Sequence, residues 1–158
     1  MYRGRLDEAR ALLDDALDVA RASDVGFHLL DRIYGTRIVI TADPDKALGV
    51  VEEAEAAVRG PLETCPGCRI TFAIPATIAS ARAHETELAS GHLRQSEYLA
   101  NVVMRLPAWH AALHEARGHV ALAAGDRQAA RQAFANAAQG FHAAGHPLDE
   151  ARCSTTAR

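Results

Sequence analysis

The sequence predicts an all-α fold built from antiparallel helical hairpins, because of its composition, a recurring turn-and-stripe pattern and its helix punctuation. Apolar residues make up 49% of the 158 residues, whereas Phe, Trp and Tyr together contribute only 5%. Alanine and leucine supply most of the apolar positions, and both favour helices over strands. A chain of this length and apolar content is expected to form one domain, residues 1–158, with a buried core.

One spacing occurs four times: a small residue in a turn is followed by small or apolar residues five, nine and twelve positions later. In an α-helix these offsets lie on one stripe, which predicts a packing face where two backbones approach. The four sets are Gly4 with Ala9, Leu13 and Ala16; Ala42 with Ala47, Val51 and Ala54; Gly91 with Ser96, Ala100 and Val103; and Gly125 with Ala130, Phe134 and Ala137.

A helix-length segment precedes three of these four turns, so the predicted unit is a hairpin of two helices. Asp43 is a suitable N-cap, with Pro44 at the first helical position. Gly145 is placed to end one helix, and Pro147 to begin the next. The expected helices are 25–41 paired with 43–59, 69–89 with 92–104, and 107–123 with 126–141, followed by 147–158.

Gly91 and Gly125 are 34 residues apart, which is the period of tetratricopeptide repeats. The predicted architecture is therefore a tetratricopeptide-like α-solenoid with about seven to eight helices. Gly35 and Gly118 each stand seven residues before a turn residue, where two helices approach closely. His84 occupies the equivalent place in the second hairpin and does not fit this role.

Charge and hydropathy limit the classes of partner. The net charge is −3, with acidic and basic residues interleaved along the chain, so a direct nucleic-acid partner is not expected. No apolar stretch approaches the roughly 20 residues that span a bilayer, and the N-terminal segment does not resemble a signal peptide. Three cysteines do not form a disulfide framework, so a reducing, cytoplasmic location is expected.

A long connection at about 60–68 interrupts the repeat, and a loop of this length is either functional or an insertion. It contains Cys65 and Cys68, whose spacing allows three interpretations. They could bind a metal, although zinc needs four ligands and no second such pair exists. They could form a redox couple at a helix start, although the usual strand–helix context is missing. They could also pack as small apolar groups in a structural loop.

One helix carries three histidines and the only tryptophan. His110 and His114 are four residues apart, so both imidazoles could lie on one helix face and bind a metal. His119 is one position too far along for the zinc-protease motif. Trp109 lies on the apolar stripe, which favours a core position over a binding hot spot. A position on the flank of that stripe is the simpler interpretation for His110 and His114.

The segments 65–76, 108–117, 125–126 and 144–153 resemble a known family. The last of them reads Ala-Gly-His-Pro-Leu-Asp-Glu-Ala-Arg-Cys and is the most distinctive. The resemblance is to the C-terminal tetratricopeptide-like, MalT-like helical-repeat region of large bacterial LuxR-like and adenylate-cyclase-like ATP-dependent regulators. It implies a sensory or scaffolding arm. The phosphate-binding loop and the DNA-recognition helix of such regulators have no counterpart in this sequence.

These observations predict a non-catalytic protein-interaction or ligand-sensing module, with no cofactor and no catalytic residues. The alternative is a metal- or redox-responsive module that uses Cys65 and Cys68. In tetratricopeptide proteins the first helices of the hairpins line a groove. The register places Arg32, Glu85, Glu115 and His119 there, and mixed charge suits an extended peptide. An ordinary solvated helix face is the other interpretation of these residues.

The first helix is expected to mediate self-association. It carries Leu6, Leu12, Leu13 and Leu17 on a stripe that is too wide for one neighbouring helix to cover. Exposed leucines would forgo about 1.5–3 kcal/mol each of burial free energy. The sequence therefore predicts a two-fold dimer through residues 1–20, unless this helix is satisfied within the monomer.

Overall fold

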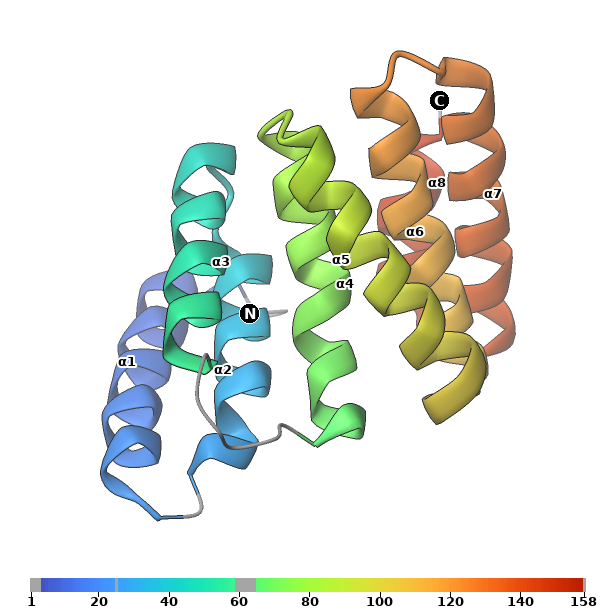
Figure 1. Ribbon diagram of the computed structural model, residues 1–158. Helices are drawn as coiled ribbons and strands as arrows, with labels where there is room; N and C mark the ends of the chain where they lie inside the picture. The colour runs from blue at the N-terminus through green and yellow to red at the C-terminus, as the bar shows by residue number, and fades with distance from the viewer. Residues whose placement is uncertain (1–3, 25, 59–64, 158) are drawn as a thin grey trace.

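The computed structural model describes residues 4–24, 26–58 and 65–157, and all regular structure within these ranges is helical. The all-α prediction is confirmed for this part of the chain. A π-helical segment, η1 (Leu99–Met104), continues directly from α5 (Figure 1). The α-helices are α1 (Leu6–Ala22), α2 (Phe27–Ile40), α3 (Pro44–Val58), α4 (Pro66–Arg82), α5 (Thr86–Tyr98), α6 (Pro107–Ala123), α7 (Arg127–Ala143) and α8 (Pro147–Thr156).

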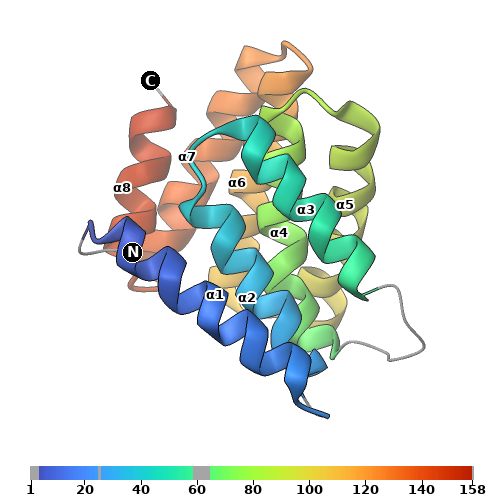
Figure 2. The same ribbon diagram turned by 90° about the vertical axis from the view of Figure 1, so that its left-hand side faces the viewer.

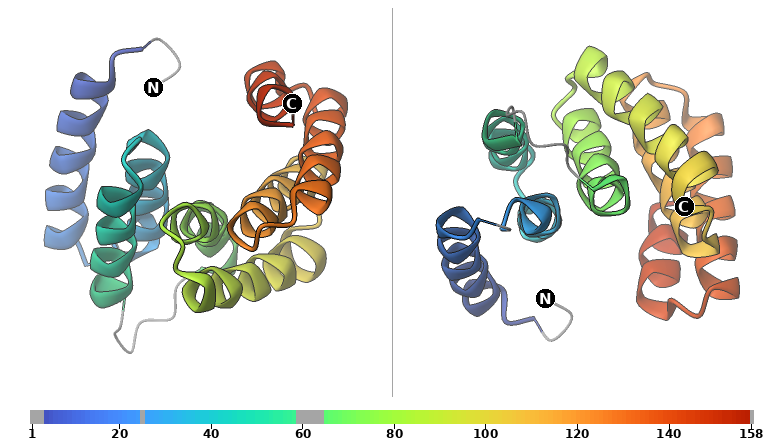
Figure 3. Two further views of the ribbon diagram at one scale, coloured as in Figure 1. Left: turned by 90° about the horizontal axis from the view of Figure 1, so that it is seen from above. Right: turned by 60° about the horizontal axis from the view of Figure 1, so that its bottom comes forward.

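The helices form an arc of antiparallel pairs (Figures 1 and 2). Helix α4 lies at its centre and packs against α2, α3, α5 and α6, while α7 packs against α6 and α8. Seen from above, α1 and α8 stand at the two ends of the arc (Figure 3). Helices α2, α4 and α6 therefore form one continuous row, and α1 is held through its contact with α2.

The apolar core follows this arc as three clusters of buried side chains. The first cluster joins α1 to α4, the second joins α4, η1 and α6, and the third joins α6, α7 and α8. Representative members are Leu17, Tyr34, Val51 and Phe72 in the first; Ile70, Leu99 and Leu113 in the second; and Ala111, Phe141 and Cys153 in the third.

Three of the connections between helices share one backbone geometry. Each contains a residue in the left-handed region: His84 (φ 62°), Gly125 (φ 79°) or Gly145 (φ 75°). In each, the next amide donates to a carbonyl five positions earlier, as Asp126 does to Ala121 at 2.9 Å. This is the Schellman arrangement that ends many helices and allows the chain to reverse direction.

The predicted turn at Gly91 is wrong. Helix α4 ends at Arg82, and Gly91 lies inside α5. The turn is made by His84, seven positions earlier, although a left-handed conformation is costly for a residue with a Cβ atom. The 34-residue spacing between Gly91 and Gly125 therefore does not separate two equivalent turns.

The two predicted close approaches are present. A Cβ atom on Gly35 of α2 would overlap the carbonyl oxygen of Thr71 in α4, so the two backbones are in direct contact. A Cβ atom on Gly118 of α6 would lie 2.8 Å from the ring of Phe134 in α7. Glycine at these two positions is thus required by packing: Gly35 lets α2 approach α4 of the next pair, and Gly118 lets α6 approach its own partner α7.

The connection predicted at about 60–68 is shorter than expected. Helix α4 begins at Pro66 rather than at residue 69, with Cys65 as its N-cap residue. Pro66, Gly67 and Cys68 therefore belong to the first turn of α4, while residues 59–64 lie outside the described ranges.

Candidate functional site

The four residues predicted to line one groove do not form a single surface. Arg32 is exposed on α2, and Glu85 is exposed in the turn before α5. Glu115 is instead buried in α6, where it accepts hydrogen bonds of 2.7 Å and 2.8 Å from Arg152 of α8. Contrary to the prediction, Glu115 is a structural ion-pair residue and not a free charge on an open groove.

His119, the fourth predicted groove residue, is largely withdrawn from solvent. Its ring packs edge-on against Phe134, with the ring centroids 5.1 Å apart. Burial lowers the pKa of His119 to about 4, although the charge of Glu115 acts in the opposite direction. At neutral pH the ring is therefore uncharged, and it contributes to the packing of α6 on α7 rather than to the capture of an anionic group.

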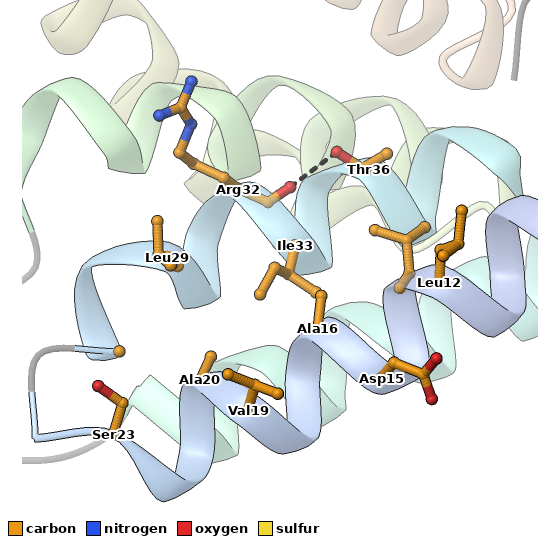
Figure 4. A pocket seen from close by; sticks show the side chains of 12 residues that line it. Leu12, Asp15, Ala16, Val19, Ala20, Ser23, Leu29, Arg32, Ile33 and Thr36 are labelled. Carbon is orange, nitrogen blue, oxygen red and sulfur yellow. Dashed lines mark hydrogen bonds between the residues drawn. The ribbon is translucent and has the colours of Figure 1, made fainter.

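A hollow with a volume of about 660 Å³ lies between α1 and α2 (Figure 4). It is open to solvent along its length. Helix α3 lies behind the α1–α2 pair in this view, so the hollow is on the side of the pair away from α3. We call it the α1–α2 hollow. Its lining residues are Leu12, Leu13, Asp15, Ala16, Val19, Ala20 and Ser23 with Gly26, Leu29, Arg32, Ile33 and Thr36.

The rim of the α1–α2 hollow carries three large apolar side chains that the monomer leaves in solvent. Leu12 is 62% exposed, Val19 is 70% exposed and Leu29 is 49% exposed. The floor is buried or half-buried and includes Ala20 and Ile33. Single exposed leucines are normal on a protein surface, but three such apolar side chains around one concave floor make this hollow a candidate binding surface.

Two charged side chains border this apolar surface. Asp15 comes from α1 and Arg32 from α2 (Figure 4). Within the described part of the chain Arg32 makes no ion pair, although its charge acts on the Cys68 thiol. The Thr36 hydroxyl donates to the Arg32 carbonyl at 2.8 Å. Arg32 is thus available to an acidic group, and Asp15 to a basic one. Arg32 is the one predicted groove residue that the structure places in a concave apolar site.

The opposite face of α1 is fixed to the core, which keeps the hollow in shape. Leu17 is only 4% exposed and packs in the first core cluster together with Tyr34. Arg21 donates hydrogen bonds to the Tyr34 hydroxyl at 2.8 Å and to Glu53 at 3.0 Å. Since Arg21 and Glu53 are largely exposed, burial of the apolar side chains is the main stabilising term.

The four leucines predicted to mediate self-association divide between core and surface. Leu12 and Leu6 are exposed, whereas Leu13 is half-buried against the first core cluster. Leu17 lies inside that cluster and is unavailable to a second copy, which corrects the prediction for this residue. Helix α1 directs Leu17 toward α2, so its neighbour in the chain covers more of the stripe than expected.

Cys65 and Cys68 stand at the start of α4. The amides of Cys68 and Gly67 lower the pKa of the Cys65 thiol, together with a hydrogen bond from the Cys68 thiol. These interactions favour the thiolate of Cys65, as is usual for a cysteine at a helix N-terminus. Burial, followed by the hydrogen bond to Cys65, raises the pKa of Cys68.

The described residues contain no cluster of three His, Cys, Asp or Glu side chains that could hold a metal ion. The thioether sulfur of Met104 in η1 would lie 3.3 Å from a Cβ atom on Gly67. The Cys65 sulfur would lie 3.7 Å from the same point. The metal interpretation of Cys65 and Cys68 stays a prediction.

Of the histidines on α6, His110 makes a polar contact within the fold and His114 is half-buried. His110 Nε2 lies 2.9 Å from the carbonyl oxygen of Ala100 in η1, which also accepts from the amide of Arg105 at 3.1 Å. Burial lowers the pKa of His114, with smaller contributions from nearby positive charge. Trp109 is partly buried and packs against the second core cluster, as its place on the apolar stripe predicts.

Val19 and Leu29 are the functional candidates that the sequence pattern missed. Val19 continues the apolar stripe of α1, so the width of that stripe was the available signal. Leu29 follows directly after the α1–α2 connection, and its exposure depends on how the two helices cross. The spacing of residues within either helix does not determine that crossing.

The described part of the chain is all-helical, and its α1–α2 hollow is a candidate apolar binding surface. Comparison with protein-family models, curated proteins and solved structures gives no match. None of the described helices is long and apolar enough to cross a membrane.

Proposed function

We propose that this chain is a non-catalytic binding module whose α1–α2 hollow takes an amphipathic helix of a partner protein. The observation that carries this proposal is the grouping of Leu12, Val19 and Leu29, all largely exposed, around one apolar floor. Covering such side chains gains about 1.5–3 kcal/mol each. The resemblance to the helical arm of ATP-dependent regulators supports the same role.

A helix suits the hollow better than an extended peptide or a small molecule. The surface is open and lies between two helices. Amphipathic helices commonly bind with their apolar face in apolar grooves of this kind. An extended strand would need free backbone groups along the groove, but within α1 and α2 these groups are used by the helices themselves. Apolar residues at positions i, i+3, i+4 and i+7 of the partner would fill the floor. An acidic residue on its flank would pair with Arg32.

The test is selection from a displayed library of helical peptides against the full chain. Peptides selected by the wild type should carry apolar residues with helical spacing, because only one face of a helix can enter the hollow. Their affinity should fall at least tenfold for Leu29→Glu, since a buried unpaired charge costs more than about 1.4 kcal/mol. Arg32→Glu should weaken the binding of peptides with an acidic flank and strengthen the binding of peptides with a basic flank.

Leu148→Glu is the matched control, because Leu148 is 57% exposed on α8 and far along the chain from the hollow. It should bind the same peptides as the wild type does. Circular dichroism should show unchanged helicity in all variants, since the substituted side chains are exposed. Selected peptides without helical periodicity, or affinities that Leu29→Glu leaves unchanged, would contradict the proposal.

A further inference from the structure

The two cysteines at the start of α4 are close to one another in space as well as in sequence. Cys65 is the N-cap residue, with an extended backbone (φ −60°, ψ 121°), and its carbonyl accepts from the Cys68 amide at 2.8 Å. This turn brings the side chains together, and the Cys68 thiol donates a hydrogen bond to the Cys65 sulfur. Both residues are partly exposed. Two partly exposed thiols within one helical turn, each acting on the pKa of the other, are candidates for a disulfide.

The surroundings of the two thiols shift their pKa values in opposite directions. The N-terminus of α4 favours the thiolate form of Cys65, because its amides lower the pKa of that thiol. Burial favours the neutral form of Cys68 and raises its pKa. Attack on a disulfide requires a thiolate, so Cys65 is suited to be the attacking cysteine. Cys68, beside it, is suited to resolve the mixed disulfide in a second step.

The remaining cysteine is excluded from this chemistry. Cys153 is buried on α8, in the third core cluster with residues of α6 and α7. Burial raises its pKa to about 12, so it stays a neutral thiol at physiological pH. It is therefore an internal control for any measurement of thiol reactivity on the folded chain.

We propose that Cys65 and Cys68 form a redox-active dithiol that is oxidised by a low-molecular-weight disulfide of the glutathione class. This activity is separate from helix binding in the α1–α2 hollow. The Cys65 thiolate attacks one sulfur of the small disulfide, whose S–S bond breaks and releases one thiolate. The Cys68 thiol then loses its proton and attacks the Cys65 sulfur. The second small thiolate leaves and takes up a proton, so the protein loses two electrons and the small disulfide becomes two thiols.

In the first experiment the full chain is equilibrated with mixtures of reduced and oxidised glutathione. Free thiols are then trapped by alkylation, and the mass of the intact protein is measured by mass spectrometry. The wild type should pass from a form that carries the trapping label on both Cys65 and Cys68 to a form that carries it on neither, with no disulfide-linked dimer. Cys153→Ser should titrate at the same ratio of oxidised to reduced glutathione. Failure to form the intramolecular disulfide at any ratio, or formation of dimers only, would overturn the proposal.

The second experiment separates the roles of the two cysteines. With oxidised glutathione at neutral pH, Cys68→Ser should accumulate a mixed disulfide at Cys65. Cys65→Ser should form its mixed disulfide more slowly, by about threefold for each unit by which the two pKa values differ. Equal rates, or faster reaction at Cys68, would contradict the assignment of Cys65 as the attacking thiol.

Two further measurements use the wild-type protein and so do not depend on the folding of a variant. Alkylation of the native wild type with iodoacetamide, followed by peptide mapping, should label Cys65 before Cys68 and leave Cys153 unlabelled. Metal analysis of the purified, reduced protein should find less than one equivalent of zinc. A full equivalent of zinc that blocks alkylation of both thiols would overturn the redox assignment in favour of a metal site.

Discussion

Arg152 of α8 donates two hydrogen bonds to the two carboxylate oxygens of Glu115 on α6, from Nε at 2.7 Å and from Nη2 at 2.8 Å. Asp149 accepts a third hydrogen bond from the same guanidinium at 2.6 Å. Because Glu115 is buried, this carboxylate depends on Arg152 for its charge compensation. The pair links α8 to a helix that is not its neighbour in the chain, and so fixes one end of the arc.

Arg152→Met should lower the free energy of unfolding by about 2–3 kcal/mol, because it leaves the Glu115 carboxylate buried without a cation. The loss should be smaller in a Glu115→Gln background, where no charge remains to be compensated. Urea denaturation of the two single variants and the double variant measures this coupling. Strictly additive losses would show that the two side chains do not depend on each other.

Stability should fall as the pH is lowered from about 6.5 toward 4, owing in part to His119. Burial holds the pKa of His119 at about 4 in the folded chain, below the ordinary value of 6.5. Between these values the unfolded chain binds a proton that the folded chain does not, which favours unfolding. The His119 contribution between pH 7 and pH 5 is about 2 kcal/mol.

Urea midpoints for the wild type and His119→Gln at both pH values measure this contribution. The variant should lose less stability on acidification, even if it is less stable at pH 7. His92 and His114 also have pKa values lowered by burial, so part of the acid sensitivity should remain. Parallel pH dependence in wild type and variant would contradict the assignment to His119.

His84→Gly should stabilise the protein by about 1 kcal/mol. His84 is held at φ 62°, a conformation that glycine adopts without the steric cost of a Cβ atom. Gly125→Ala, at the equivalent turn, should cost a similar amount. Thermal unfolding of both variants should therefore shift the midpoint in opposite directions. A lower midpoint for His84→Gly would mean that the imidazole contributes more than the backbone strain costs.

This turn also explains which parts of the fold the sequence could predict. The bounds of α6 and α7 follow from the Gly125-Asp126 turn, whose glycine marks the left-handed position and whose Asp126 side chain caps α7. The end of α4 was missed because His84 takes the place of that glycine. Tertiary packing imposes the left-handed conformation there, and no local preference of the sequence signals it.

The candidate site was less predictable than the helices. The apolar stripe of α1 correctly indicated exposed leucines, and Leu12 is one of them. The assignment of Glu115 to an open groove failed because Arg152, distant in sequence, closes over it. Both outcomes depend on which helix packs over a given face. Periodicity identifies that a face exists but does not identify its occupant.

Self-association through α1 remains a prediction, now with a defined surface. At tens of micromolar the wild type should sediment as a dimer, because a second copy covers Leu12 and Val19 in the absence of a partner. Leu12→Glu combined with Val19→Glu should give a monomer of unchanged helicity. Leu13 and Leu17 are unsuitable for this test, since both contact the core. A monomeric wild type would rule out the dimer.

A methyl NMR titration of the full chain with a selected helical peptide locates the bound peptide on the surface. Binding in the α1–α2 hollow predicts shifts confined to the methyl groups of Leu12, Val19, Leu29 and their neighbours, with Leu148 unchanged. A second group of exposed apolar side chains, around Val102 and Leu106, offers a competing surface. Shifts at Val102 and Leu106 without shifts at Leu12, Val19 and Leu29 would contradict the proposed function.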